Sequence, residues 1–177
     1  MITATDGNIA FFRIPRISKA CVHTDWTFCK KFTIHQSSVK CVDLNQVSGM
    51  LQLLLKLTID GIIHILTGGD DNAVHLTQME VTERDIICTP LAKVLDAHTS
   101  TVTGVLFLGG SRYLSVGIDQ KIRIWKDEGE RLWLFCEGYT FVPDVCGIAD
   151  LGVKEDRRRF VVFGTGMELL EWQDDVA

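Results

Sequence analysis

A histidine and a serine stand close together in the second half of this sequence, in a pattern that could do chemistry. His98 lies two residues before Ser100, a spacing that could join a base to a nucleophile. Cys41 and Cys146 could each supply a thiolate if a histidine lay nearby in the fold. Two adjacent acidic pairs, at positions 70–71 and 174–175, could share acid and base roles.

The sequence around these residues argues against catalysis. The acidic pairs fall in an expected turn and near the last residue, where solvated or capping roles are expected. Cys41 and Cys146 lie in strand-like patterns, which favours unreactive core thiols. The chain has no phosphate-binding glycine loop, no nucleophile elbow and no paired-histidine zinc motif. We therefore predict no catalytic residue and no cofactor.

The cysteine spacing and the N-terminal residues indicate a reduced compartment. No two of the six cysteines are separated by two residues, so a structural zinc site is not expected. Asp6 interrupts the first residues before a signal peptide could form, so we expect free thiols in a soluble, cytoplasmic protein. The most apolar stretch, 50–66, contains polar and charged residues and does not predict a membrane span.

Basic residues form one dense cluster in a chain whose net charge is −5. Such residues could contact RNA phosphates or a protein partner from a loop. Because acids stand beside them and the total charge is negative, a solvated hairpin turn is the favoured interpretation. The cluster consists of Lys154, Arg157, Arg158 and Arg159, and a looser group consists of Arg13, Arg16, Lys19, Lys30 and Lys31.

Short β-rich segments alternate with turn residues along the chain. Segments 39–44, 102–108 and 121–125 have β-branched or alternating apolar patterns. Gly, Asp and Asn gather between such segments, at 6–8, 68–72 and 109–111. The sequence therefore predicts an all-β fold.

The strand pattern also repeats. Asp6, Asp71, Asp119 and Gly166 can be aligned, and they are separated by 65, 48 and 47 residues. The residue three positions after each of them is apolar: Ile9, Val74, Ile122 and Leu169. A period in the forties with several short strands per unit is typical of propeller blades.

The unit from 97 to 125 resembles a WD40 repeat. Its residues His98, Ser115, Asp119 and Trp125 match the hydrogen-bonded tetrad of that repeat, in which Asp binds His, His binds the hydroxyl and the hydroxyl binds the indole. This structural role explains His98 better than a catalytic one. The neighbouring units match in part, with His35, Thr67 and Asp71 before Thr77 in one, and Trp172 after Gly166 in the other.

The resemblance implies a partial WD40-type β-propeller of about three to four blades, the C-terminal piece of a larger ring, since closure takes about four to eight. We predict the end of a truncated blade at 1–34, a blade with an insertion near 45–61 at 35–96, the best-matching blade at 97–140, and a last blade without its outer strand at 141–177. The insertion is either an apolar lip for a partner or, as favoured, a lengthened hairpin over its own blade.

The order of these units is similar to the C-terminal end of one family of large double-propeller proteins, WD repeat-containing protein 6 and its fungal counterparts. The run 142–145 (Val-Pro-Asp-Val) and the ending 164–172 (Gly-x-Gly-x-Glu-x-x-x-Trp) carry most of this resemblance. The yeast member partners the methyltransferase that modifies the ribose 2′-hydroxyl in the tRNA anticodon loop. The resemblance implies a non-catalytic scaffold for a tRNA 2′-O-ribose methyltransferase acting on the wobble nucleotide, with S-adenosylmethionine held by that enzyme. An adapter in endosomal trafficking or ubiquitin-ligase assembly, without RNA, stays open as the alternative.

Overall fold

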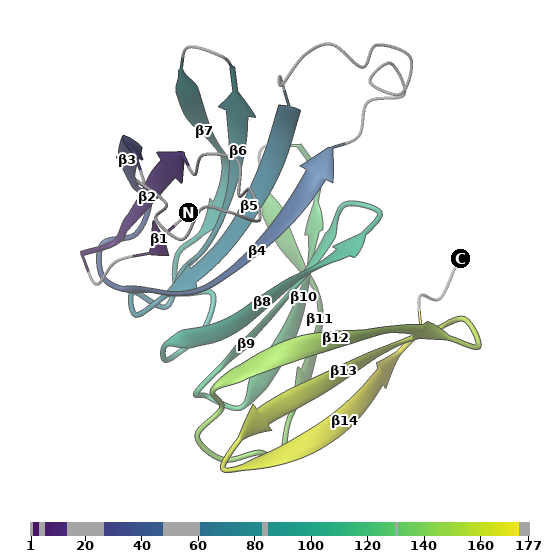
Figure 1. Cartoon of the computed structure of the whole chain (residues 1–177). Coiled ribbons are helices and arrows are strands. Elements are labelled where there is room, and N and C mark those ends of the chain that lie inside the picture. Colours follow the sequence, from purple (N-terminus) through teal and green to yellow (C-terminus); the bar gives the residue numbers. More distant parts are fainter. Residues whose placement is uncertain are drawn as a thin grey trace, which may run out of the picture.

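The chain folds into four antiparallel sheets in sequence order (Figure 1). The computed structural model describes residues 2–3, 6–13, 27–47, 61–82, 85–129 and 131–173. Sheet A contains β1 (Ile2–Thr3), β2 (Asn8–Arg13) and β3 (Thr27–Thr33), and sheet B contains β4 (Val39–Val47), β5 (Gly61–Gly69), β6 (Val74–Val81) and β7 (Ile86–Val94). Sheet C contains β8 (Val102–Gly109), β9 (Arg112–Gly117), β10 (Lys121–Asp127) and β11 (Leu132–Tyr139), and sheet D contains β12 (Gly147–Lys154), β13 (Arg157–Gly164) and β14 (Gly166–Trp172). Among the described residues no helix has the length and apolar character needed to cross a membrane.

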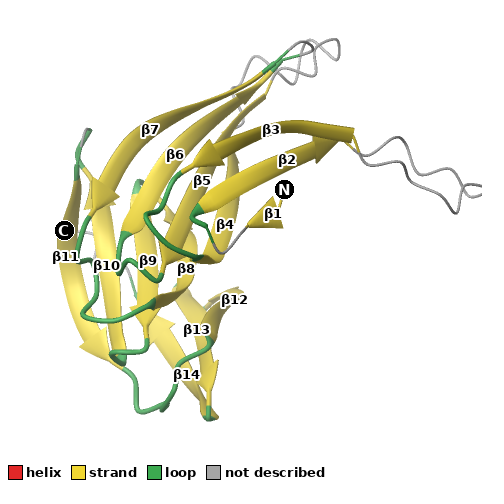
Figure 2. Cartoon of the chain, turned by 90° about the vertical axis from the view of Figure 1, so that its left-hand side faces the viewer, coloured by secondary structure: helices red, strands yellow, loops and turns green. Residues whose placement is uncertain are grey.

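The inner strands are apolar on both faces because the sheets pack against one another in succession. In β6, Leu76 packs toward sheet C and Met79 packs toward sheet A, and both are buried. A strand covered on both faces needs apolar residues at consecutive positions. The alternation of apolar and polar residues is therefore weak in the strands that are most deeply buried. Figure 2 shows β2 and β3 of sheet A lying beside sheet B.

The turns after the three aligned aspartates have the same backbone conformation. Gly7, Asn72 and Gln120 follow Asp6, Asp71 and Asp119, and their φ values are 76°, 61° and 59°. This left-handed region favours Gly and Asn, and the anchor carboxylate supports it by accepting backbone N–H groups. The three turns are therefore structural equivalents.

A β-bulge recurs at one position of the repeat. The pairing register shifts at Phe11/Phe12 in sheet A, at Leu76/Thr77 in sheet B and at Ile124/Trp125 in sheet C. Bulges bend and twist a strand locally. The recurrence shows that the outer strands of the three sheets are built to one pattern.

Each pair of neighbouring sheets encloses a core. Ile9 and Ile65 belong to the core between sheets A and B, Val74 and Val102 to that between B and C, and Phe160 to that between C and D. The prediction of an all-β, partial propeller is confirmed. In the part of the chain that the structure describes, the four sheets form an open arc and not a closed ring (Figures 1 and 2).

The predicted insertion falls largely outside the described residues. Positions 45–47 continue β4 and Gly61 begins β5, while 48–60 are not described. The two interpretations of this segment stay open, and the predicted blade boundaries stay predictions. Also outside the description are Arg16, Lys19, Cys21, Asp174 and Asp175, and the side chain of Arg13.

Candidate functional site

The four predicted tetrad residues of sheet C lie in one hydrogen-bonded chain. His98 Nδ1 lies 2.8 Å from Asp119 Oδ1, and His98 Nε2 lies 2.8 Å from Ser115 Oγ. The indole Nε1 of Trp125 donates to the same Ser115 oxygen at 2.8 Å. Sheet pairing places Ser115 on β9 beside β10, which carries Trp125, while His98 precedes β8.

The charge state of this chain follows from its burial. Desolvation lowers the pKa of His98, partly offset by the Asp119 carboxylate, and favours a neutral ring. Desolvation alone would raise the pKa of Asp119, but donation from the Thr99 N–H and from His98 outweighs it and lowers that pKa. The pair is therefore a neutral imidazole that donates from Nδ1 to a carboxylate, and Nε2 accepts from the Ser115 hydroxyl.

The predicted partial tetrad of sheet B has the same geometry without the indole. His35 Nδ1 lies 2.7 Å from Asp71 Oδ1, and its Nε2 lies 2.9 Å from Thr67 Oγ1. Thr77 occupies the position of Trp125 and is buried. The ring of His75 lies 4.4 Å from the His35 ring, centroid to centroid.

His35, Asp71 and His75 form a group that could hold a metal ion, since their ligand atoms lie within 4.8 Å of one another. However, His35 Nδ1 and Asp71 Oδ1 are already hydrogen bonded to each other, and His35 Nε2 contacts Thr67. A metal ion would have to replace part of the tetrad. The prediction of no metal stays a prediction.

Sheet D carries a substitute for the tetrad that the sequence reasoning missed. The Thr140 N–H donates to the Gln120 carbonyl, as the His98 N–H donates to the Asn72 carbonyl, so Thr140 stands at the histidine position. Its hydroxyl donates to Glu168 Oε2 at 2.6 Å, and the Phe141 N–H donates to the same oxygen at 3.0 Å. Glu168 thus acts from β14 in place of the missing aspartate at Gly166. The predicted member of this unit, Trp172, packs on the core between sheets C and D and lies 5.5 Å from the Arg112 guanidinium.

A glycine lies two residues before Asp71, Asp119 and Gly166, three of the four aligned residues, and makes room for these contacts. A Cβ at Gly69 would lie 2.7 Å from His35 Nδ1, and one at Gly117 would lie 2.9 Å from His98 Nδ1. At Gly164 the nearest atom would be the Asp144 carbonyl oxygen, at 2.4 Å. The Gly-x-Asp spacing was visible in the sequence and could have marked the sites.

The dense basic cluster is largely paired with acids. Arg157 and Arg159 both bind Glu171, at 3.2 and 2.9 Å, and Arg158 binds Asp150 at 2.6 Å. Arg158 also donates to the carbonyls of Phe107 and Leu108 on β8, so it links sheets D and C. Lys154 is exposed and has no ion pair in the part of the chain that is described. The predicted RNA or partner contact by Lys154, Arg157, Arg158 and Arg159 stays a prediction.

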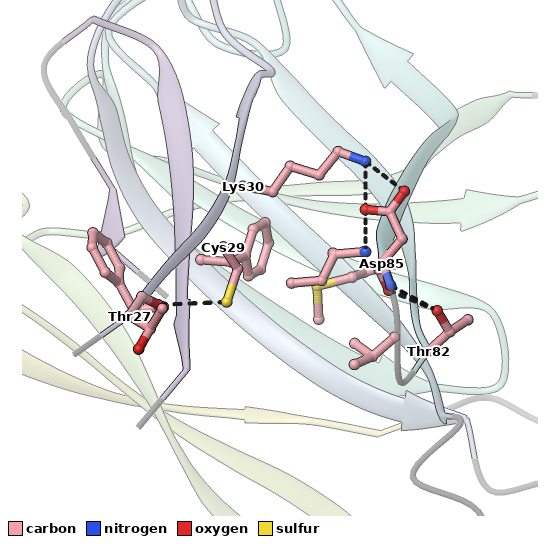
Figure 3. Close-up of a pocket in the computed structure, with 10 residues that line it drawn as sticks. Thr27, Cys29, Lys30, Thr82 and Asp85 are labelled. Atoms are coloured by element: carbon pink, nitrogen blue, oxygen red, sulfur yellow. Dashed lines mark hydrogen bonds and ion pairs between the residues drawn. The ribbon is translucent and has the colours of Figure 1, made fainter. Parts of the chain in front are cut away.

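A cavity of about 490 Å³ opens between β3 and the β6–β7 hairpin (Figure 3). The Lys30 amino group binds both Asp85 oxygens, at 2.8 and 3.0 Å, so the charged groups at this cavity neutralise each other. Cys29 Sγ lies 3.5 Å from the Thr27 carbonyl oxygen on the same strand. In the looser basic group, Lys31 likewise binds Asp6, at 2.8 Å.

Two of the side chains first considered for catalysis, those of His98 and Cys41, are not arranged for it. His98 is buried and both its ring nitrogens are engaged in the tetrad, so it is not available to activate Ser100. Burial raises the pKa of Cys41 to about 12 and that of Cys88 to about 11, which keeps both thiols protonated. The cysteines of the described ranges are free thiols.

The sheets, turns and hydrogen-bonded chains define the fold class: a partial β-propeller of the WD40 type. Residues 89–126 match the family of the WD domain, G-beta repeat. The sequence is 26% identical over 191 aligned positions to the rat tRNA (34-2′-O)-methyltransferase regulator WDR6. The alignment covers 97% of this chain and 16% of the relative. Its identity to the mouse and human proteins of the same name is 30% and 29%, over 65% of this chain and 10% of each relative. The chain thus spans between a tenth and a sixth of the length of these relatives.

Proposed function

We propose that this chain is a non-catalytic scaffold that regulates a tRNA 2′-O-ribose methyltransferase acting on the wobble nucleotide. The observation that carries the proposal is the similarity over 97% of the chain to a protein named as a regulator of such an enzyme. The geometry is compatible with this role, because His35 and His98 are each engaged in hydrogen bonds within their own sheet and offer no free catalytic group. The cytoplasmic location expected from the sequence belongs to the same proposal.

The scaffold would act by orientation. An enzyme gains a large part of its rate from holding the reactants in position, and a rigid propeller surface can supply that to a partner. The methyl donor would bind the partner enzyme, so this chain needs no cofactor site of its own. Of the predicted contact residues, Lys154 is the one on the β12–β13 turn that is free of acid partners in the described residues, and we propose it as the contact of that turn.

Co-purification and methyl transfer test the proposal together. The chain is tagged in its source cells, and the captured proteins are identified by mass spectrometry. We expect a ribose methyltransferase in the captured set, and reduced wobble-nucleoside methylation when the gene is deleted. Capture of trafficking or ubiquitin-ligase components with unchanged methylation would refute the proposal. Methyl transfer by the purified chain alone would refute its non-catalytic part.

The substitution Lys154→Glu provides a sharper version of the co-purification test. Arg157→Glu is the matched control, because Arg157 is paired with Glu171. If the turn contacts RNA or the enzyme, Lys154→Glu weakens complex formation more than Arg157→Glu does. Equal effects would remove Lys154 from the proposed contact.

A further inference from the structure

Sheets B and C differ at one buried position, and the difference leaves a hollow. In sheet C the Trp125 side chain packs into the core shared with sheet B, and its indole donates to Ser115. The equivalent residue of sheet B is Thr77, which points toward sheet A, as does Met79 two residues later. The threonine is too small to fill the place that the indole fills in sheet C.

A cavity of about 520 Å³ occupies this place between sheets A and B. A volume of this size falls within the range of ligand pockets. Its walls are mostly apolar side chains from the end of β3 and from β7. The lining consists of Phe32, Thr33, Ile34, His75, Thr77, Cys88, Pro90, Leu91, Ala92, Lys93 and Arg131.

One polar atom in the wall lacks a partner. The Nε2 atom of His75 is buried and forms no hydrogen bond in the structure. Burial, together with the nearby His35 ring, lowers the pKa of His75 to about 4, so its ring is neutral at neutral pH. A neutral imidazole can donate or accept one hydrogen bond here, and a buried group without a partner favours a ligand that supplies one.

The rim of the cavity is cationic. Lys93 and Arg131 are both exposed, and neither forms an ion pair with any residue in the described ranges. This contrasts with the cavity of about 490 Å³ described above, where Lys30 is neutralised by Asp85. In a chain of net charge −5, two unneutralised cations beside an apolar hollow favour an anionic group attached to a flat ring.

We propose that this cavity binds a nucleotide of single-stranded RNA, with the base between sheets A and B and the phosphate at Lys93 and Arg131. The choice of RNA rests on the proposed function. The base takes the volume that the Trp125 indole takes in sheet C, and one of its edge atoms bonds His75 Nε2. Insertion of an unstacked base into a side-chain pocket is how proteins read single-stranded RNA.

The substitution Thr77→Trp tests the proposal, because it fills the cavity with the same side chain that sheet C carries at the equivalent position. Binding of a fluorescent single-stranded oligoribonucleotide to the full chain is followed by anisotropy. We expect wild-type binding to weaken at least about tenfold in Thr77→Trp, while the melting temperature stays the same or rises. Lys93→Ala, which leaves the core intact, should also weaken binding and reduce its salt dependence. Lys126→Ala is the matched control, because Lys126 is already paired with Glu128 and lies outside the cavity lining.

Several outcomes overturn the inference. Binding that is unchanged in both Thr77→Trp and Lys93→Ala removes the RNA site, and so does equal binding of duplex RNA. The inference would also be wrong if phosphate were the only competitor that displaces the RNA, since the base would then contribute nothing to binding. Tight binding of an indole-containing peptide with no RNA binding would assign the cavity to a protein partner instead.

The two proposals can fail separately. If the chain captures the methyltransferase but Thr77→Trp leaves RNA binding unchanged, the inference fails and the scaffold function stands. If the chain binds RNA in a Thr77→Trp-sensitive manner but captures no methyltransferase, the scaffold function fails and the cavity assignment stands.

Discussion

Replacing Ser115 with alanine removes one oxygen atom on which two buried side chains depend. His98 Nε2 and Trp125 Nε1 both lie 2.8 Å from Ser115 Oγ, and all three residues are buried. A buried polar group left without its partner costs about 1–3 kcal/mol, so the variant should lose about 2–6 kcal/mol of unfolding free energy. That is a large part of the stability of an ordinary domain.

Sheet B provides the matched control. Thr67→Val keeps the shape of the side chain and deprives one group, His35 Nε2, of its partner, because Thr77 offers no indole. The expected cost is about 1–3 kcal/mol, half of that for Ser115→Ala. The two substitutions thus compare a shared hydroxyl with an unshared one in the same molecule.

Urea unfolding followed by circular dichroism gives the two free energies. Hydrogen exchange of the Trp125 indole proton, observed by NMR, provides a second readout that reports on the broken bond directly. Equal costs for the two variants, or a loss below about 1 kcal/mol for Ser115→Ala, would refute the shared-acceptor interpretation. Unchanged protection of the indole proton would refute it as well.

Three further predictions concern other parts of the chain. Gly117→Ala should destabilise the fold by about 1–3 kcal/mol, because its Cβ would press on the His–Asp pair, whereas Gly138→Ala, with open space around the Cβ, should be neutral or stabilising in thermal melts. Arg158→Ala should cost about 2–4 kcal/mol in urea, because it leaves two partly buried carbonyls of β8 and one carboxylate without their donor. Lys154→Ala should change stability by less than about 0.5 kcal/mol. The pKa of His75 is lowered to about 4 in the folded state from an ordinary 6.5, so the unfolded chain takes up the proton at a higher pH than the folded chain does. The free energy of unfolding should therefore fall as the pH drops from about 6.5 to about 4. We expect a loss of about 2 kcal/mol, because the side chain is partly exposed to solvent. His75→Gln should remove that step from a stability–pH profile, and its persistence would assign the step to another group.

The repeat pattern predicted most of the frame because the frame depends on local residues. An aspartate in a tight turn binds backbone N–H groups within two residues of itself, and this requirement is visible in the sequence at Asp71 and Asp119. The histidine partner lies four residues before the first strand of its sheet in both cases, His35 before β4 and His98 before β8. The sequence therefore predicted which residues form the tetrads of sheets B and C.

The interactions that the sequence did not predict join residues whose proximity depends on tertiary packing. Glu168 on β14 binds Thr140, which lies between β11 and β12, and it does so from a position where the aligned repeat has no acid. Arg158 donates to carbonyls of β8, about fifty residues away in sequence, a link between sheets that no local pattern indicates. The cavity beside Thr77 was also missed. The sequence shows that threonine replaces tryptophan at this position, but whether a cavity results depends on which side chains sheet A places there.

The backbone contacts between successive turns have a direction that bears on how the protein is made. The Gly7, Asn72 and Gln120 carbonyls accept the N–H groups of His35, His98 and Thr140, so each turn receives the first residue of the next repeat. A nascent chain leaving the ribosome would find each acceptor already formed before its donor is synthesised. The sheets can therefore assemble in order from the N-terminus, each one providing the hydrogen-bond acceptor for the next. A premature stop codon would leave the last complete sheet with one turn carbonyl that has no N–H donor.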